Sequence, residues 1–429
     1  MAYLIKLIKK TYKMARPHER RTVLKNAASL TTLQAITYLL PLILMPYLFR
    51  VLGAAKFGLV AFAQALVQYF MIVTDYGFGI SATKEISLCR HDRGRICEIF
   101  SAVMTAKLAF ALLSLLILCL IVLFIPKFRA DWMIYLLSFG AVIGNTLFPV
   151  WFFQGTEKMK HIADLNIAGG LIFAVCIFLL VRAPEDYLLV AVVNSGVFLF
   201  TGILGLYIVF HKFKVAFKVP GYKNLWKELA AGWNIFISNV AINAYTTTRI
   251  FAVGLLTNNS ITGFYSMAEK ISGVFQTFPL YSFTQAIFPR LSRIYRINKL
   301  KALNIMRHIQ QITMLAALIF LPAVFALAHP IVRVACGGDY PQTVMALRFL
   351  IISVFFICSN AFRVQFLLVC GKTRLYSRIH ITMAMIGLPL IFLLIHYFSY
   401  SGAAMATVLI ESGIFLLTYF AVRRLKFSK

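Results

Sequence analysis

The fold is decided by uncharged stretches such as residues 108–125, which read LAFALLSLLILCLIVLFI. An α-helix rises about 1.5 Å per residue, so this stretch would be about 27 Å long, close to the roughly 30 Å of hydrocarbon in a bilayer. The whole chain shares this character: of 429 residues, 61% are hydrophobic and only 13% are charged, and the mean hydropathy is +0.82. Soluble domains carry about 25% charged residues. The composition therefore excludes a water-soluble enzyme and predicts an all-α, polytopic membrane protein.

Cutting the chain at its charge clusters predicts twelve transmembrane helices in two six-helix lobes around a central cavity. The expected spans are 27–50, 57–80, 100–125, 132–153, 162–182, 187–210, 230–256, 261–288, 308–329, 342–369, 375–397 and 402–422. The chain then has five parts, which are a basic amphipathic segment at 1–26, an N-lobe at 27–210, a cytoplasmic linker at 211–229, a C-lobe at 230–422 and a basic tail at 423–429.

The distribution of the 43 Lys and Arg residues predicts the orientation of these spans. If both termini are cytoplasmic, 32 of them fall in cytoplasmic segments and six in outer loops. This bias follows the positive-inside rule and requires an even number of spans. The net charge of +29 is therefore explained by an anionic membrane face, and we expect no nucleic-acid partner.

The ends and the cysteines add two further expectations. Lys6, Lys9, Lys10 and Lys13 recur at helical spacing, which favours a helix lying on the cytoplasmic leaflet over a disordered basic tail. The seven cysteines include no CxxC pair and there is no histidine cluster, so we expect no disulfide framework, no metal and no other cofactor.

Two stretches indicate an internal duplication. Residues 52–63 resemble residues 256–268 with one insertion, which aligns Gly58 with Gly263 between the first and second spans of each half. Because six spans is an even number, both halves would have the same orientation, and a substrate path between the lobes is the usual consequence. A second pair of stretches, each closing a fourth span, supports the same alignment: residues 153–155 and 369–371.

Charged residues within the spans are the candidate site, because a charge at the bilayer centre costs at least about 2.5–3.5 kcal/mol. Five basic residues and two acids lie there, and this positive excess favours an anionic ligand. With Arg50 from the outer end of the first span, the candidate substrate-binding residues are Arg249, Lys270, Arg363, Lys107, Arg50 and Arg348. The candidate ion-coupling residues are Glu269 and Glu411.

Several of these charges also have a purely structural interpretation. Lys270 follows Glu269 and is expected either to pair with it or to point elsewhere, Lys107 has the length to reach the cytoplasm, and Arg348 suits an interface anchor. The two glutamates would serve equally well for local charge balance. Asp75, near the cytoplasmic end of its span, is expected to be a structural contact.

Four motifs carry a family resemblance. They are residues 38–53 (YLLPLILMPYLFRVLG), Phe57-Gly58, Asp75-Tyr76-Gly77-Phe78 with Ser81-Ala82-Thr83, and residues 149–155 (PVWFFQG) followed by 157–160 (EKMK). In these motifs and in its span count the chain resembles the Wzx-type O-antigen flippases. These are polysaccharide transporters of the multidrug/oligosaccharidyl-lipid/polysaccharide exporter superfamily.

The resemblance implies a V-shaped bundle that moves an undecaprenyl-pyrophosphate-linked oligosaccharide between leaflets of a bacterial inner membrane. A diphosphate cannot cross hydrocarbon bare, so we expect Arg and Lys in a hydrated cavity to hold it during alternating access. Coupling to an H⁺ or Na⁺ gradient is left open. So is association with the O-antigen polymerase and chain-length regulator, beside the surrounding membrane lipids.

Three rival functions make different demands on the sequence. An exporter of small cationic drugs on the same scaffold predicts an acidic or aromatic cavity, which the intramembrane charges oppose. A membrane glycosyltransferase, polymerase or ligase needs catalytic outer loops, yet the longest one, residues 330–341, has Asp339 as its only acid. A flippase of peptidoglycan precursors differs only in cargo and is the closest alternative.

Overall fold

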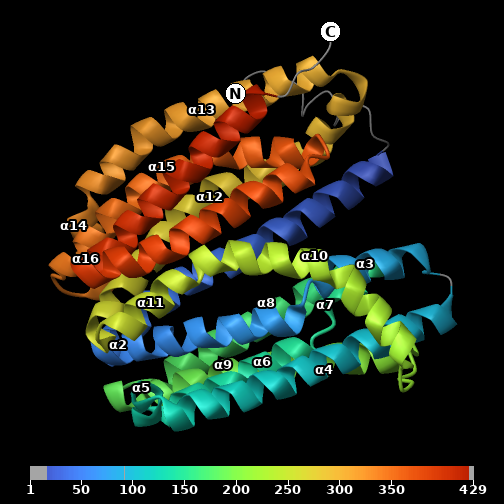
Figure 1. Cartoon of the computed structure of the whole chain (residues 1–429), viewed down its shortest axis with the longest axis horizontal. Helices are drawn as coiled ribbons and strands as arrows, with labels where there is room; N and C mark the ends of the chain where they lie inside the picture. Colours follow the sequence, from blue (N-terminus) through green and yellow to red (C-terminus); the bar gives the residue numbers. More distant parts are fainter. Residues whose placement is uncertain (1–16, 91, 425–429) are drawn as a thin grey trace.

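The computed structural model describes residues 17–90 and 92–424, and all regular secondary structure in these ranges is helical (Figure 1). Residues 1–16 of the expected N-terminal segment and residues 425–429 of the expected tail lie outside the described ranges. The helices are α2 (Pro17–Asp75), α3 (Phe78–Leu88), α4 (Arg93–Phe124), α5 (Pro126–Ala130), α6 (Trp132–Leu147), α7 (Val150–Gly155), α8 (Met159–Leu180), the short 3₁₀ helix η1 (Pro184–Asp186), α9 (Tyr187–His211), α10 (Tyr222–Thr246), α11 (Thr248–Leu256), α12 (Asn259–Ile297), α13 (Lys299–Ala326), α14 (Ala328–Cys336), α15 (Pro341–Val369) and α16 (Thr373–Arg423).

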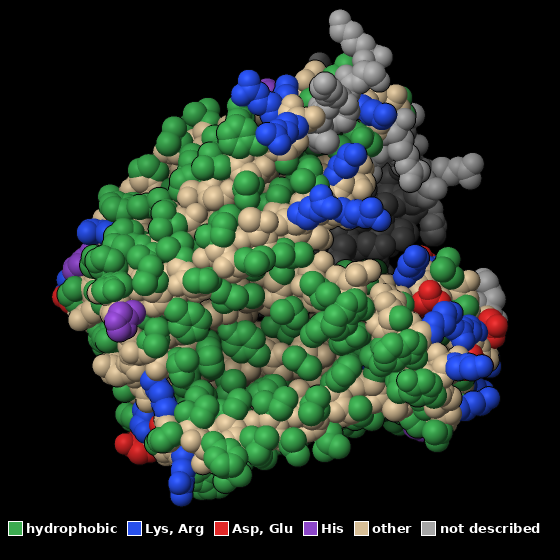
Figure 2. All heavy atoms as spheres, viewed as in Figure 1, with side chains coloured by type: hydrophobic (Ala, Val, Ile, Leu, Met, Phe, Trp, Pro, Cys, Tyr) green, Lys and Arg blue, Asp and Glu red, His purple; other side chains and the backbone are tan. Residues whose placement is uncertain are grey.

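Apolar side chains face outward along the helices. In the described residues, eight helical segments are long and apolar enough to cross a membrane. On α4, Leu112, Leu123 and Phe124 are 70%, 64% and 77% exposed. In water, each Å² of such exposed apolar surface would cost about 25 cal/mol of free energy relative to burial. Figure 2 shows hydrophobic side chains across the middle of the visible face, with Lys and Arg gathered towards its ends. The chain is therefore a multi-pass membrane protein.

Two of the long helices turn back on themselves. In α2 the helix is interrupted at Gly53, whose φ of 71° suits glycine, and in α16 at Ser399, with φ 54° and ψ −134°. After the second turn, a Cβ placed on Gly402 would lie 1.9 Å from the carbonyl oxygen of Leu394, so the two halves of α16 pack closely. All twelve expected spans fall mainly on helical residues, and the number of membrane crossings stays a prediction.

Polar caps set the starts of several helices. The side chain of Asp92 accepts a hydrogen bond from the Arg95 amide at the start of α4, at 3.0 Å. Asn258 and Asn298 do the same for α12 and α13, at 2.9 and 2.8 Å. Such caps satisfy an amide that the first helical turn leaves unpaired and contribute about 1 kcal/mol each.

The helices form two lobes, which Figure 1 separates by colour. The first lobe runs from α2 to α9 in blue to green, and α10 to α16 form the second in yellow-green to red, with α10 and α11 on its side facing the first lobe. We call the end that holds the turns at 89–92 and 156–158 and the segment 212–221 the basic end. Within the stretch 211–229 expected as a linker, α10 already begins at Tyr222.

The two lobes touch through glycines at the opposite end. A Cβ on Gly58 of α2 would lie 1.8 Å from the Asn259 carbonyl oxygen and 2.5 Å from the Gly263 amide nitrogen of α12. A Cβ on Gly263 would lie 2.0 Å from the Ala54 carbonyl oxygen. Only glycine permits this approach of the two backbones. The sequence alignment that places Gly58 over Gly263 is therefore supported, because aligned residues of two repeats meet only at their symmetry axis.

Polar contacts join the lobes around these glycines. Arg50 donates to the carbonyl oxygens of Val334 and Ala335 in the last turn of α14. Lys127 donates to the carbonyl oxygens of Leu255 and Thr257 at the end of α11, at 3.0 and 2.8 Å. Each cation thus sits at the negative end of a helix dipole in the other lobe, worth about 0.3–1 kcal/mol. With the 2.6 Å contact between the hydroxyls of Tyr69 and Thr248, these bonds form what we call the latch.

Candidate functional site

Arg249 lies where three helices of the second lobe meet. It follows the turn at Thr247 that separates α10 from α11. Its Nη2 is 3.1 Å from Oε1 of Glu269 on α12, and its Nη1 donates to Oγ1 of Thr407 on α16 at 3.2 Å. Its Nε donates to the Thr246 carbonyl oxygen at 3.1 Å. With side chains only 15% and 20% exposed, Arg249 and Glu269 form a largely enclosed ion pair within a membrane protein.

A second carboxylate belongs to this group. Glu411 lies one helical turn after Thr407 on α16 and interacts electrostatically with Arg249. Among the described residues Glu411 has no ion-pair partner within 4.0 Å. One arginine therefore faces two carboxylates, so the group carries an excess negative charge when both are ionised. Such a group can take up one proton or one small cation without leaving a net charge in the lobe.

A buried tyrosine and histidine extend the polar group towards the basic end. The Tyr245 hydroxyl on α10 lies 2.9 Å from Nδ1 of His380 on α16, and the two side chains are 4% and 8% exposed. Nε2 of His380 has no hydrogen-bond partner in the described part of the chain. This pair was not among the candidate residues predicted from sequence, although a histidine within an apolar span is itself a signal of function.

Lys107 lies apart from Arg249, in the first lobe. Its Nζ is 3.0 Å from Oδ1 of Asp75 at the end of α2, and the amide nitrogen of the Asn145 side chain on α6 donates to the same oxygen at 3.3 Å. The side chains of Lys107 and Asp75 are 3% and 54% exposed. The helix breaks directly afterwards, at Tyr76 with φ 42° and Gly77 with φ 82°. Asp75 is thus a structural contact, and Lys107 is a buried cation with one half-exposed acidic partner.

Arg363 lies in the packing between α15 and α16. It is 7% exposed and donates from Nη1 to the Phe415 carbonyl oxygen at 3.2 Å. Its guanidinium carbon lies 4.3 Å from the ring centre of Phe415 and 5.2 Å from that of Tyr419. Cation–π contacts of this kind stabilise a desolvated arginine without an acid. In this structure Arg363 therefore serves the core of the second lobe.

The other candidate cations lie in separate places. Lys270 on α12 is exposed, next to Glu269 but without a described ion pair of its own. Arg348 on α15 is exposed and lies 5.4 Å from the ring centre of Phe325. Arg50 belongs to the latch. Among the described residues, the structure thus brings Arg249, Glu269 and Glu411 together and does not gather the six cations into one cluster.

Comparison with known proteins supplies an independent line of evidence. The sequence profile of a family described as "Polysaccharide biosynthesis protein" matches residues 23–295, well over half of the chain. A protein of Escherichia coli (strain K12) named "Putative O-antigen transporter" is 29% identical over 408 residues, 94% of this chain and 97% of that protein. A protein of Shigella dysenteriae with the same name is 28% identical over 404 residues, 93% of this chain and 100% of that protein.

Solved structures share the fold at low sequence identity. The lipid II flippase MurJ, in an inward closed conformation, superposes with a TM-score of 0.75 at 14% identity, covering 92% of this chain and 87% of MurJ. An inward-facing multidrug resistance MATE transporter of the MOP superfamily gives a TM-score of 0.69 at 13% identity, covering 90% and 94%. The predicted all-α, two-lobed membrane fold is confirmed.

Proposed function

Because this chain belongs to the polysaccharide biosynthesis protein family and is a membrane transporter rather than an enzyme, we propose that it flips a lipid-linked O-antigen repeat unit. The cargo is an undecaprenyl-pyrophosphate-linked oligosaccharide, moved from the cytoplasmic to the periplasmic leaflet of a bacterial inner membrane. The observation that supports this most directly is the match to two transporters named for O-antigen over more than nine-tenths of the chain. Both termini are then cytoplasmic, as the positive-inside bias predicts.

The contacts between the lobes suit alternating access. At the end away from the basic loops, the lobes are held by the Gly58–Gly263 contact and by the latch. The latch consists of a few hydrogen bonds between exposed or partly buried groups, each worth about 0.5–1.5 kcal/mol net, so it can be broken and remade. Cargo enters from the cytoplasmic side while the latch holds, and opening the latch releases it to the periplasm.

We assign the first contact with the diphosphate to Arg249. Its side chain is 15% exposed, and its guanidinium contacts Glu269 and Thr407. A diphosphate oxygen replacing Glu269 would keep the charge-assisted hydrogen bond while freeing the carboxylate. We propose Lys270, exposed one residue along α12, as the next contact of the head group.

The freed carboxylate supplies a means of coupling. With Arg249 engaged by the diphosphate, Glu269 and Glu411 would both be unpaired, and two carboxylates in a poorly hydrated site favour uptake of a proton or Na⁺. Release of the cargo would return Arg249 to Glu269 and expel that cation. In this mechanism uptake and release of the cation follow binding and release of the cargo, and the polymerase and chain-length regulator receive the cargo afterwards.

A peptidoglycan-precursor flippase is the second candidate, because MurJ shares the fold over 92% of this chain. The two functions separate in one experiment. Expressed in cells that lack their own O-antigen flippase but keep the rest of the pathway, the chain should restore the surface polysaccharide ladder on a gel. Expressed in cells depleted of MurJ, it should fail to restore growth. Rescue of growth without a polysaccharide ladder would overturn the proposal.

A further inference from the structure

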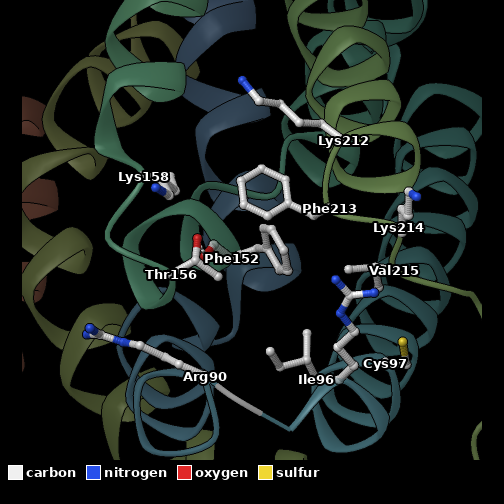
Figure 3. Close-up of a pocket in the computed structure, with 11 residues that line it drawn as sticks. Arg90, Ile96, Cys97, Phe152, Thr156, Lys158, Lys212, Phe213, Lys214 and Val215 are labelled. Carbon is white, nitrogen blue, oxygen red and sulfur yellow. Dashed lines mark hydrogen bonds between the residues drawn. The ribbon is translucent and has the colours of Figure 1, made fainter.

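A second polar feature, outside the helices that surround Arg249, is a cavity of about 290 Å³ at the basic end of the first lobe. It lies between the turn from α3 to α4, the turn from α7 to α8 and the segment after α9 (Figure 3). Phe152 and Phe213 lie side by side at its centre, and basic side chains surround them. Its five cationic residues are Arg90, Arg93, Lys158, Lys212 and Lys214.

The positive charge of this pocket is poorly balanced. None of its lining residues is acidic. Arg90 turns to Glu157 beside the pocket, with Nη2 2.8 Å from Oε1, and this contact lowers the pKa of Glu157. Arg93, Lys158 and Lys214 have no ion-pair partner in the part of the chain that the structure describes. Positive-inside placement explains why cations are on this side of the membrane, but not why they converge on one cavity.

The backbone is held in unfavourable conformations at two points around the pocket. Of the described residues other than glycine, four have positive φ, and two of these are Glu157 (58°) and Lys214 (52°). This conformation is disfavoured for residues with a side chain, and such residues concentrate where function requires them. At Lys214 the strained backbone places a lysine on the cavity wall.

The segment that brings two of the lysines is tied to the first lobe. The amide of Ala216 donates to Sγ of Cys97 at 3.3 Å, and the amide of Lys218 donates to Oγ of Ser101 at 2.9 Å. Both acceptors are on α4, so the non-helical segment that carries Lys212 and Lys214 runs along α4 before α10 begins. A polyanion in the pocket would therefore neutralise lysines from this connection together with cations from the two neighbouring turns.

Apolar residues next to the pocket indicate that its ligand comes from the membrane. Leu88, Met159 and Phe217, each within three residues of a lining cation, are 74%, 59% and 49% exposed. A water takes about 30 Å³ in the liquid, so the cavity has room for a group of many atoms. Basic pockets at the cytoplasmic ends of membrane helices suit anionic lipid headgroups.

We propose that this basic pocket binds the phosphate headgroup of an anionic phospholipid from the cytoplasmic leaflet. The bound lipid holds the connection between the lobes against α4 and neutralises cations that otherwise repel one another. Phosphate is the chemistry recognised, and a membrane lipid is its source. This site is separate from Arg249 and does not depend on which cargo the transporter carries.

Native mass spectrometry of the full-length, delipidated protein titrated with cardiolipin tests the proposal. Replacing Arg93, Lys158 and Lys214 together by alanine should weaken cardiolipin binding at least about tenfold, since each basic residue contributes appreciably to headgroup binding. The control removes three exposed cations of the same end that do not line the pocket, Lys160, Lys223 and Lys372, and should change binding less than about twofold. Phosphatidylethanolamine, which is neutral overall, should bind weakly to all three proteins.

A charge-conserving variant and a competition with pyrophosphate distinguish this lipid site from the alternatives. The variant Lys158→Arg with Lys214→Arg keeps the charges and should retain binding, which separates loss of the site from loss of folding. Millimolar inorganic pyrophosphate should leave cardiolipin bound. Equal losses in the two alanine variants would overturn the proposal in favour of diffuse surface charge, and full displacement by pyrophosphate would overturn it in favour of a soluble ligand.

Discussion

At the scale of single residues, Arg249 shows how a membrane protein keeps a charge available. Its three guanidinium nitrogens all have partners, which are the Glu269 carboxylate, the Thr407 hydroxyl and the Thr246 carbonyl oxygen. A buried pair of this kind adds little net stability, because desolvation offsets the attraction. Its presence inside the lobe therefore points to a role in binding, which Arg363, packed on aromatic rings, does not share.

Replacing Arg249 tests this assignment directly. Arg249→Ala should abolish surface O-antigen in cells that lack their own flippase, because the first contact with the diphosphate is lost. Arg249→Lys should retain part of it, since the ammonium keeps the charge but cannot reproduce the planar set of donors. The measurement is the polysaccharide ladder on a gel, with membrane levels of each variant checked by immunoblot.

The matched control is Arg129→Ala, which removes an exposed arginine from α5, at the end of the first lobe opposite the basic end. It should leave the ladder unchanged. A normal ladder from Arg249→Ala at normal membrane levels would show that Arg249 does not hold the cargo.

At the scale of helices, the contact between α2, α4 and α6 is asymmetric. Lys107 is 3% exposed and Asp75 is 54% exposed, so water can solvate the acid but not the base. Asp75→Asn should therefore cost about 2–3 kcal/mol of unfolding free energy, somewhat below the cost for two fully buried partners, because it leaves a buried ammonium unpaired. Lys107→Met, which fills the same space without charge, should cost less than about 1 kcal/mol.

Unfolding of the purified protein in detergent, followed by circular dichroism against denaturant, measures both changes. The double variant should be closer to the wild type than Asp75→Asn alone, because the unpaired cation has been removed. If Asp75→Asn and Lys107→Met lost the same unfolding free energy, the difference in exposure between Lys107 and Asp75 would have no energetic effect.

Hydropathy and charge predicted most of the helices, because crossing a bilayer imposes a length and an apolar character that local sequence records. They did not predict the break at Tyr76 and Gly77, or the pairing of Lys107 with Asp75 32 positions away. An amphipathic period shows which face of a helix is polar, but the partner of a polar residue depends on how helices pack. The pairing of Tyr245 with His380 was missed for the same reason.

At the scale of the whole molecule, the weak internal repeat predicted the two lobes and aligned Gly58 with Gly263, and the structure shows that these two glycines meet. Among the described residues the six candidate cations lie in separate places. In a medium of low polarity each charge takes the nearest compensating group, such as Glu269, Asp75, two aromatic rings or a helix end. Composition gives the excess of charge and cannot show this distribution.

The glycine contact makes a prediction about the motion of the lobes. Gly58→Ala would place its Cβ 1.8 Å from the Asn259 carbonyl oxygen and must push α2 away from α12. The latch should then open more often, which exposes Cys336, the last residue of α14, now 2% exposed. Burial raises the pKa of the Cys336 thiol to about 12, so it reacts slowly while covered.

In cells expressing a form whose other six cysteines are replaced, Gly58→Ala should speed labelling of Cys336 by a membrane-impermeant maleimide several-fold. Gly273→Ala on α12 is the control, because a Cβ there would meet nothing within 4 Å. Unchanged labelling in Gly58→Ala, with a normal O-antigen ladder, would show that this contact does not govern closure.

The closeness of Gly58 and Gly263 has a mechanical consequence. Two bare backbones that meet on a symmetry axis carry no protruding groups to interlock, so one lobe can pivot on the other there at small energetic cost. Resistance to this rotation then comes from the hydrogen bonds that Arg50, Lys127 and Tyr69 make with the facing lobe. Substitutions that strengthen or weaken one of these hydrogen bonds would change the rate of lobe movement and leave the glycine contact unaltered.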